Sequence, residues 1–349
     1  MLRDRRNHSL VNSGVIRVGI VGYGLAGSVF HAPLIRACDR MRIASILTSR
    51  DAPHRVSSLD ELIERSDMVV VASPNTTHCR IAKQALEAGK HVVVDKPLTA
   101  TLAEADELIR TASKAGRVLG AFHNRRWDSD YLTVREVLPQ LGEVLLFEAN
   151  WDRFRPAIKQ GWREVPDAGA GLFKDLGPHL IDQALQLFGI PDAVEADIMA
   201  QREEAAVDDY FDVTLHYGRA RVRLRSSSIV AAPGPRFAVH GTGGSFVKFG
   251  LDPQEAQLKG GMDARDPSFG VDPQPGTLTL PGGATEAIAT ERGEYVAFYE
   301  AIADAILDGA PVPVTAEEAQ EGLALIDLAR AAAQQGRRLP VPAANSTAG

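Results

Sequence analysis

Three side chains of this sequence have the types and the spacing for proton transfer at an alcohol. Asp175 and His179 are four residues apart at the start of an expected helix, so they project from one face. Lys96 follows Asp95 at the end of an apolar run, where open α/β sheets place their ligands. Removing a hydride from a carbinol carbon requires a base for the hydroxyl proton and a cation near the developing alkoxide. His179 can supply the base and Lys96 the cation, while Asp175 can orient His179 or the substrate.

A glycine-rich turn near the N-terminus favours this chemistry over a structural explanation, in which the lysine is only solvated and the histidine only packs. Residues 15–21 predict a buried strand, and a helical pattern covers residues 26–37. Strand, G-x-G-x-x-G and helix in this order are the dinucleotide-binding fingerprint. Its glycines permit a tight turn, a close approach to a pyrophosphate and close packing of helix on strand. We expect cofactor contacts from Gly22, Tyr23, Gly24, Leu25, Ala26 and Gly27.

The end of the second expected strand, residues 41–48, favours NADP over NAD. An acidic residue there binds the 2′-hydroxyl of NAD, whereas an arginine accommodates the 2′-phosphate of NADP. This sequence has Thr48, Ser49 and Arg50, whose hydroxyls and guanidinium suit a phosphate. Asp51 comes next, and a shift of one residue would make it the ribose ligand, so NAD stays open as the less favoured alternative.

Strands and helices alternate in the first third of the chain, which predicts a doubly wound parallel sheet. We assign residues 15–122 to this Rossmann dinucleotide-binding domain, after a charged and disordered tail of residues 1–14. The stretch at residues 50–59 is short, which predicts that the third strand is stunted or missing.

Beyond residue 122 the pattern changes to that of an α+β domain. Four strand candidates between residues 194 and 240 have short connections, so we expect an open, mostly antiparallel sheet flanked by helices. Residues 123–340 form this substrate-binding and oligomerisation domain, whose C-terminal helices can pack back on the first, and residues 341–349 form a flexible tail. Residues 251–287 are rich in Gly, Pro and Asp and predict a long loop.

Composition excludes several classes of partner. The net charge of −7 disfavours nucleic acid and membrane surfaces, and no apolar run approaches the length of a membrane span. Cys38 and Cys79 have neither metal-ligand nor redox spacing, so we expect no metal and reduced thiols in a cytoplasmic protein. Because an exposed antiparallel sheet invites pairing unless it is covered, we expect a homodimer or homotetramer.

Motifs in both domains resemble the glucose–fructose oxidoreductase and inositol dehydrogenase (Gfo/Idh/MocA) family. They are the glycine turn, Pro74-Asn75 with His78, Asp95-Lys96-Pro97, and residues 175–182. The resemblance implies a Rossmann domain, a C-terminal sheet that often mediates oligomerisation, and catalysis by the lysine of an E-K-P motif and the histidine of a D-x-x-x-H motif, here Lys96 and His179. Asp95 stands where the family has glutamate. Pro97 is expected to fix the lysine backbone, with a cis peptide as one option.

Within that family, the sequence is more closely similar to the NADP-dependent scyllo-inositol dehydrogenase branch. The similarity lies in residues 25–34, in residues 124–133 and in Trp162-Arg163. It implies NADP, in agreement with the residues that end the second strand. The further cofactor contacts that we expect are Ser73, Pro74, Asn75, His78, Asp95, Lys96, Pro97, Asn124, Trp162 and Arg163.

A polyol pocket needs partners for hydroxyl groups rather than one strong charge, and flat tryptophans cover the C–H faces of sugars. The substrate contacts that we expect are Lys96, Asn124, Arg126, Trp151, Asp152, Arg153, Asp175 and His179. Two alternatives stay open: the tryptophans pack in the core or at an interface, and the arginines bind cofactor phosphate.

The leading hypothesis is a cytoplasmic, NADP-dependent dehydrogenase that acts on a secondary alcohol of a cyclic polyol or sugar, such as scyllo-inositol, by direct hydride transfer without a metal. Reduction of a keto-sugar or of another carbonyl uses the same residues and stays open. The alternatives from other classes are a nucleotide-sensing regulatory protein of the same fold and a structural homo-oligomer. The presence of both Lys96 and His179 argues against these two.

Overall fold

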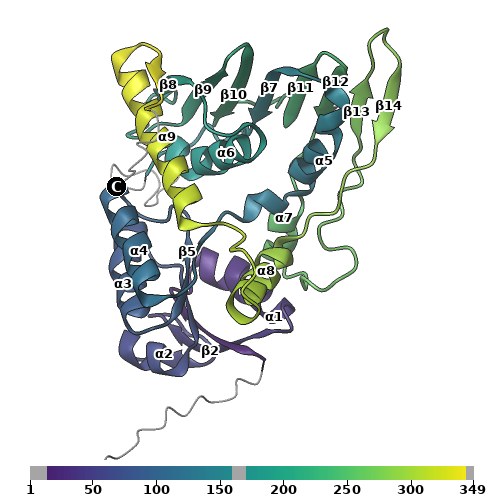
Figure 1. Ribbon diagram of the computed structural model, residues 1–349. Helices are drawn as coiled ribbons and strands as arrows, with labels where there is room; N and C mark the ends of the chain where they lie inside the picture. The colour runs from purple at the N-terminus through teal and green to yellow at the C-terminus, as the bar shows by residue number, and fades with distance from the viewer. Residues whose placement is uncertain (1–13, 159–169, 343–349) are drawn as a thin grey trace, which may run out of the picture.

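A parallel sheet organises the N-terminal part of the chain (Figure 1). The computed structural model describes residues 14–158 and 170–342. The strands of this sheet are β1 (Ile16–Val21), β2 (Met41–Leu47), β3 (Arg55–Val56), β4 (Met68–Val71), β5 (His91–Asp95) and β6 (Leu119–Phe122). They lie in the order β3-β2-β1-β4-β5-β6, and every pairing is parallel. The order confirms the expected Rossmann sheet, and β3 has only two residues, as the short stretch after β2 predicts.

Helices cover this sheet because its central strands are apolar on both faces. All four residues of β4 are fully buried. The covering helices are α1 (Ala32–Ala37), α2 (Leu59–Arg65), α3 (His78–Glu87) and α4 (Leu102–Ala115). The first turn of α4 is fixed by a capping box, in which Thr101 and Glu104 bond each other's backbone amides.

The helix expected over residues 26–37 is divided. A π-helical turn, η1 (Ala26–His31), leads into α1. Pro33 lies in the first turn of α1 and has no N–H to donate to the turn before it. The backbone directly after the glycine turn is therefore wider than an α-helix, a departure often found at functional sites.

A second sheet occupies the C-terminal part of the chain. Its strands are β7 (Val144–Asn150), β8 (Ala193–Met199), β9 (Tyr210–Tyr217), β10 (Ala220–Ser227), β11 (Phe237–Gly241), β12 (Gly244–Lys248), β13 (Gly276–Thr279), β14 (Thr285–Ile288) and β15 (Leu339–Pro340). They lie in the order β14-β13-β12-β11-β7-β10-β9-β8-β15. The β7–β10 pair is parallel and the other pairs are antiparallel, so the prediction of a mostly antiparallel sheet is confirmed.

The prediction of one long loop over residues 251–287 is wrong. That stretch contains α7 (Gln254–Lys259), β13 and the start of β14. These elements are only six, four and four residues long, and glycine and proline separate them. Elements this short carry too few turns or alternations to show a period.

Four further helices pack on and between the two sheets. They are α5 (Ser129–Val137), α6 (Leu172–Phe188), α8 (Tyr295–Leu307) and α9 (Ala316–Gln335). In Figure 1, α6 lies directly under the second sheet, and α9 runs from that sheet to α4. Phe298 and Tyr299 of α8 are fully buried in the core of the first sheet. None of the described helices combines the length and the apolar character needed to span a bilayer.

Candidate active site

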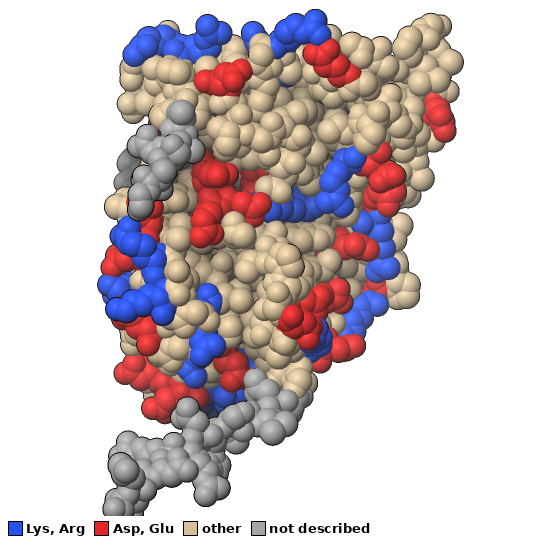
Figure 2. Space-filling model, in the orientation of Figure 1, with Lys and Arg blue, Asp and Glu red and all other residues tan. Residues whose placement is uncertain are grey.

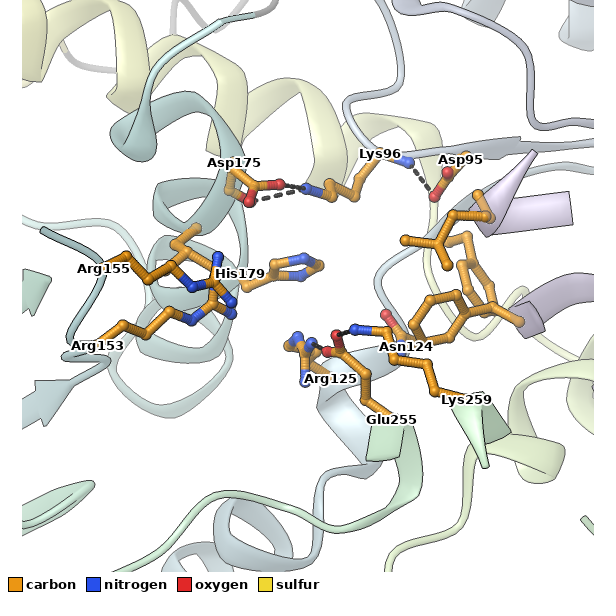
Figure 3. A pocket seen from close by; sticks show the side chains of 15 residues that line it. Asp95, Lys96, Asn124, Arg125, Arg153, Arg155, Asp175, His179, Glu255 and Lys259 are labelled. Carbon is orange, nitrogen blue, oxygen red and sulfur yellow. Dashed lines mark hydrogen bonds and ion pairs between the residues drawn. The ribbon is translucent and has the colours of Figure 1, made fainter. Parts of the chain in front are cut away.

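A cavity of about 220 Å³ lies where the carboxyl ends of β5 and β6 meet α6. On the face shown in Figure 2, acidic and basic side chains gather side by side between the two sheets. Figure 3 shows the cavity from close by, with side chains from both halves of the chain pointing into it. Its lining residues are Leu25, Ala26, Phe30, Asp95, Lys96, Phe122, Asn124, Arg125, Arg153, Arg155, Asp175, Leu176, His179, Glu255 and Lys259.

Lys96 reaches across this cavity to α6. Its Nζ donates to the main-chain carbonyl of Asp175 at 2.7 Å and to Oδ1 of the same residue at 3.2 Å. Its backbone amide donates to Oδ1 of Asp95 at 2.9 Å, and the Lys96–Pro97 peptide is cis. The ammonium group is therefore held at a fixed point between β5 and the first turn of α6.

His179 lies one turn after Asp175 on α6, as the four-residue spacing predicts. The residue is only 6% exposed, and its Nδ1 has no hydrogen-bond partner among the described residues. Burial lowers the pKa of His179 well below its ordinary value, and the positive charges of Lys96 and Arg125 lower it further. The imidazole is therefore neutral and able to accept a proton.

The glycine turn has the shape that a dinucleotide requires. Gly22 has φ +93°, and a Cβ there would meet the carbonyl of Ala72. A Cβ on Gly27 would meet the carbonyl of Gly22, whereas a Cβ on Gly24 would meet no atom within 4 Å. Two glycines are thus needed for the fold itself, and the third keeps open space beside the start of η1, as close approach of a pyrophosphate demands. The residues present therefore fit the pyrophosphate of a dinucleotide.

The loop that follows β2 lies beside the glycine turn. The amide of Gly22 donates to the carbonyl of Leu47 at 2.9 Å, so Thr48, Ser49 and Arg50 follow directly beside the glycine turn. Arg50 is exposed, and its backbone amide donates to Oγ1 of Thr48 at 3.1 Å.

His78 connects two other expected cofactor segments. Its Nε2 lies 2.9 Å from the carbonyl oxygen of Ser73, and its Nδ1 lies 2.9 Å from that of Pro97. The loop that carries Pro74 and Asn75 is thereby tied to the residue after Lys96.

Three expected substrate residues are not among the side chains that line the cavity, and for Trp151 this agrees with the alternative of packing in the core. Arg126 is bound by both carboxylate oxygens of Asp182 (2.9 and 2.7 Å) and by Glu318 (3.2 Å). Trp151 is 2% exposed, with the guanidinium of Arg125 stacked 4.2 Å from its ring centre. Asp152 accepts from Arg225 at 2.8 Å and from the amide of Ser227 at 3.0 Å. All three stabilise the walls of the cavity instead, because buried charges and rings take protein partners.

The other expected contacts divide between the cavity and the rest of the chain. Asn124 and Arg153 line the cavity together with Lys96, Asp175 and His179. Trp162 and Arg163 lie outside the described residues.

Several lining residues were missed from the sequence. Arg125 is buried and binds Glu255 of α7, which also binds Lys259. Burial raises the pKa of Glu255, but the charges and hydrogen bonds of Arg125 and Lys259 outweigh it and lower the pKa to about 2. The only sequence signal was the four-residue spacing of Glu255 and Lys259, in a stretch that we interpreted as a loop.

Another buried histidine near the cavity was also missed. His31 of η1 lies behind Asp95, with Nδ1 2.6 Å from the hydroxyl of Tyr299 and Nε2 3.9 Å from Oδ1 of Asp95. Burial lowers its pKa to about 4. His31 therefore packs as a neutral ring between the strand end and α8.

Comparison with known proteins gives matches along almost the whole chain. Two family models match: "Oxidoreductase family, NAD-binding Rossmann fold" at residues 16–123 and "Oxidoreductase family, C-terminal alpha/beta domain" at residues 137–342, both of the GFO/IDH/MocA type. The scyllo-inositol 2-dehydrogenase (NADP(+)) IolW of Bacillus subtilis is 41% identical over 341 residues, with 93% of this chain and 95% of the relative covered. The uncharacterized oxidoreductase YdgJ of Escherichia coli is 44% identical over 328 residues, with 90% and 95% covered. The structure of YPO2259 from Yersinia pestis has a TM-score of 0.92 at 43% identity, with 95% and 99% covered.

Proposed function

The chain belongs to the Gfo/Idh/MocA family of oxidoreductases, and from that premise we propose that it transfers a hydride between NADP and a secondary alcohol or ketone of a cyclic polyol or sugar. The observation that carries the proposal is the joint placement of Lys96, Asp175 and His179 in the cavity beside the glycine turn. A dehydrogenase acting on CH–OH groups needs this base and this cation.

The proposed mechanism assigns each of these side chains one task. The reacting hydroxyl lies between Nζ of Lys96 and the imidazole of His179. His179, neutral because it is buried among cations, accepts the hydroxyl proton during oxidation and returns it during reduction. Lys96 stabilises the negative charge that develops on the substrate oxygen, and Asp175 holds the ammonium group in place. When bound, the nicotinamide ring supplies the acceptor or donor of the hydride.

The choice of NADP rests on two supports. Thr48, Ser49 and Arg50 follow β2 beside the glycine turn and offer two hydroxyls and a guanidinium to a 2′-phosphate. The Bacillus subtilis relative bears NADP(+) in its name. The same relative makes scyllo-inositol the first neutral compound to test.

We also propose a homodimer or homotetramer that uses the face of the second sheet turned away from α6. Met199 and Tyr210 lie opposite each other on that face, and Met199 is 43% exposed. Burying such exposed apolar side chains on association removes them from water. The mass of the purified chain in solution, measured by light scattering, should be a multiple of the monomer mass, and a monomer would contradict this part of the proposal.

The direct test of the proposed function is absorbance of the reduced nicotinamide, with NADP or NAD and a panel of scyllo-inositol, myo-inositol and common aldoses. We expect reduction of NADP by an inositol or a sugar. Reduction of NAD alone would contradict the role given to Arg50 and leave the catalytic assignment standing. Absence of reduction with every compound, while the nucleotide binds, would contradict the proposed substrate class.

A further inference from the structure

Two arginines enter the cavity from one short segment alongside the second sheet. The amide of Arg153 donates to the carbonyl of Ser227 at 2.9 Å, and the amide of Arg155 donates to that of Ser228 at 2.6 Å. Side chains alternate along such an extended segment, so the two arginines share one side while Phe154, 59% exposed, takes the other. Figure 3 shows both guanidinium groups on the side of the cavity opposite Asp95.

The carboxylates around these arginines already have other partners. A smaller pocket adjoins the cavity and shares Arg153, Arg155 and Asp175 with it. The acids that line either space bind as follows: Asp175 to Lys96, Glu255 to Arg125 and Lys259, Asp208 to Arg330 (3.1 Å), Asp209 to Arg202 (2.6 Å), and Asp95 to the amide of Lys96. Within residues 14–158 and 170–342, the side chains of Arg153 and Arg155 form no ion pair and no hydrogen bond.

Arg153 is half-buried, and an unpaired guanidinium in such a place costs free energy, whereas Arg155 is exposed. The guanidinium carbon of Arg153 lies 5.6 Å from the centre of the Trp151 ring. Burial lowers the pKa of Arg153 and the charge of Arg155 lowers it further, while the carboxylates of Asp175 and Glu255 offset this only in part. A bound anion would offset the lost hydration of Arg153 and the repulsion between the two cations. Paired guanidinium groups match the oxygens of a carboxylate or a phosphate.

We propose that the substrate of this site carries an anionic group, a carboxylate or a phosphate, which Arg153 and Arg155 bind while the reacting hydroxyl lies at Lys96 and His179. This inference rests on the proposed dehydrogenase function and narrows its substrate class to acidic sugars or polyols. The expected binding site for the dinucleotide phosphates is a different one, at Gly24 and the start of η1. It lies next to the first sheet, whereas Arg153 and Arg155 lie next to the second.

The test compares compounds that differ only in the anionic group: D-glucose, D-glucuronate and D-glucose 6-phosphate, and the corresponding galactose set. Binding to the full chain with NADP present is measured by calorimetry, and turnover is measured in parallel. The variants are Arg153→Met, Arg155→Met and Arg155→Lys, which keeps the charge but loses the fork of donors. Arg219→Met is the matched control, because Arg219 is an exposed cation paired with Glu143 on the second sheet.

We expect one acidic member of a set to bind about 10- to 100-fold more tightly than its neutral counterpart, as charge-assisted hydrogen bonds allow. Arg153→Met and Arg155→Met should bring that ratio close to one, Arg155→Lys should lower it in part, and Arg219→Met should leave it unchanged. Whether the uronate or the phosphate shows the preference identifies the anion. Thermal unfolding of each variant checks that the fold is retained.

Three results would overturn the inference. The first is equal binding of neutral and acidic compounds. The second is an equal loss of affinity for both kinds of compound in the arginine variants. The third is a loss of NADP affinity in these variants, which would assign the arginines to the cofactor. Failure of the inference and failure of the proposed function are distinguishable. Tight binding of an acid without turnover would support the anion site and contradict the dehydrogenase function. Turnover of neutral polyols without any preference for acids would support the dehydrogenase function and contradict the anion site.

Discussion

The glycine turn offers a ligand the backbone of one continuous segment, here called the backbone wall, whereas the cavity next to it is lined by charged side chains of several segments, here called the side-chain wall. On the first wall, Gly22 and Gly27 are required by contacts a Cβ would make, and Gly24 leaves space. On the second, Lys96, Arg125 and Asp175 come from elements far apart in the chain. We therefore expect substitutions at the glycine turn to change cofactor affinity and substitutions at the cavity side chains to change turnover.

The largest effect should come from Lys96→Met on the side-chain wall. Loss of the cation near the developing alkoxide should lower kcat/KM by about 10²–10³-fold, the usual cost of removing one oxyanion donor. NADP affinity, measured by the fluorescence of the reduced cofactor, should stay within the range of the wild type. Lys83→Met, which removes an ammonium group paired with Glu107 on α3 and α4, is the control. A parallel loss of cofactor affinity would show that the two walls are not separable.

The backbone wall can be divided by two alanine substitutions. Gly22→Ala should destabilise the fold by about 1–3 kcal/mol, because a Cβ at positive φ is strained and would meet the carbonyl of Ala72. Gly24→Ala should leave the melting temperature unchanged and weaken nucleotide binding, because nothing in the chain occupies its space. Thermal unfolding and nucleotide titration of both variants check this. Equal destabilisation by both would mean that the space at Gly24 is not kept for a ligand.

A smaller effect is expected at the cofactor's ribose. Arg50→Gln should reduce the preference for NADP over NAD by about tenfold, the lower part of the range for a hydrogen bond to a charged group. The affinity for NAD should change little, since NAD offers no 2′-phosphate. Competition titrations with both nucleotides measure the ratio. An unchanged ratio would indicate that Arg50 is a solvated residue and would return Asp51 to consideration.

The smallest expected effect concerns the pH dependence of kcat/KM. Because the pKa of His179 is lowered, its neutral form persists below the ordinary value of about 6.5. Alcohol oxidation should therefore keep a constant kcat/KM as pH falls through 6.5 and should decline only at lower pH, where the ring becomes protonated. The pH profile of kcat/KM with His179→Gln as reference tests the assignment. A decline that begins above pH 6.5 and is absent in the variant would contradict it.

The same contrast explains what could be predicted from the sequence. Three features of the site are local patterns in the sequence: the glycine turn, the strand that ends at Asp95-Lys96, and the spacing of Asp175 and His179. The structure has each of them at the residues that the pattern predicts. The partners of Arg125 and Arg126 are set by contacts across the fold, with Glu255 and with Asp182 and Glu318, which no local period encodes. For this reason Arg126 was placed in the pocket and Arg125 was overlooked, although the two are neighbours in sequence.

The central claim is that the carbinol hydrogen of a polyol passes directly to the nicotinamide between Lys96 and His179. Its most direct test uses scyllo-inositol, or the best substrate of the panel, with deuterium on the ring carbons. The wild-type chain and NADP are incubated with it, and the reduced cofactor is analysed by mass spectrometry. The account predicts one deuterium in the reduced nicotinamide, and reduction that brings in hydrogen from solvent would contradict it.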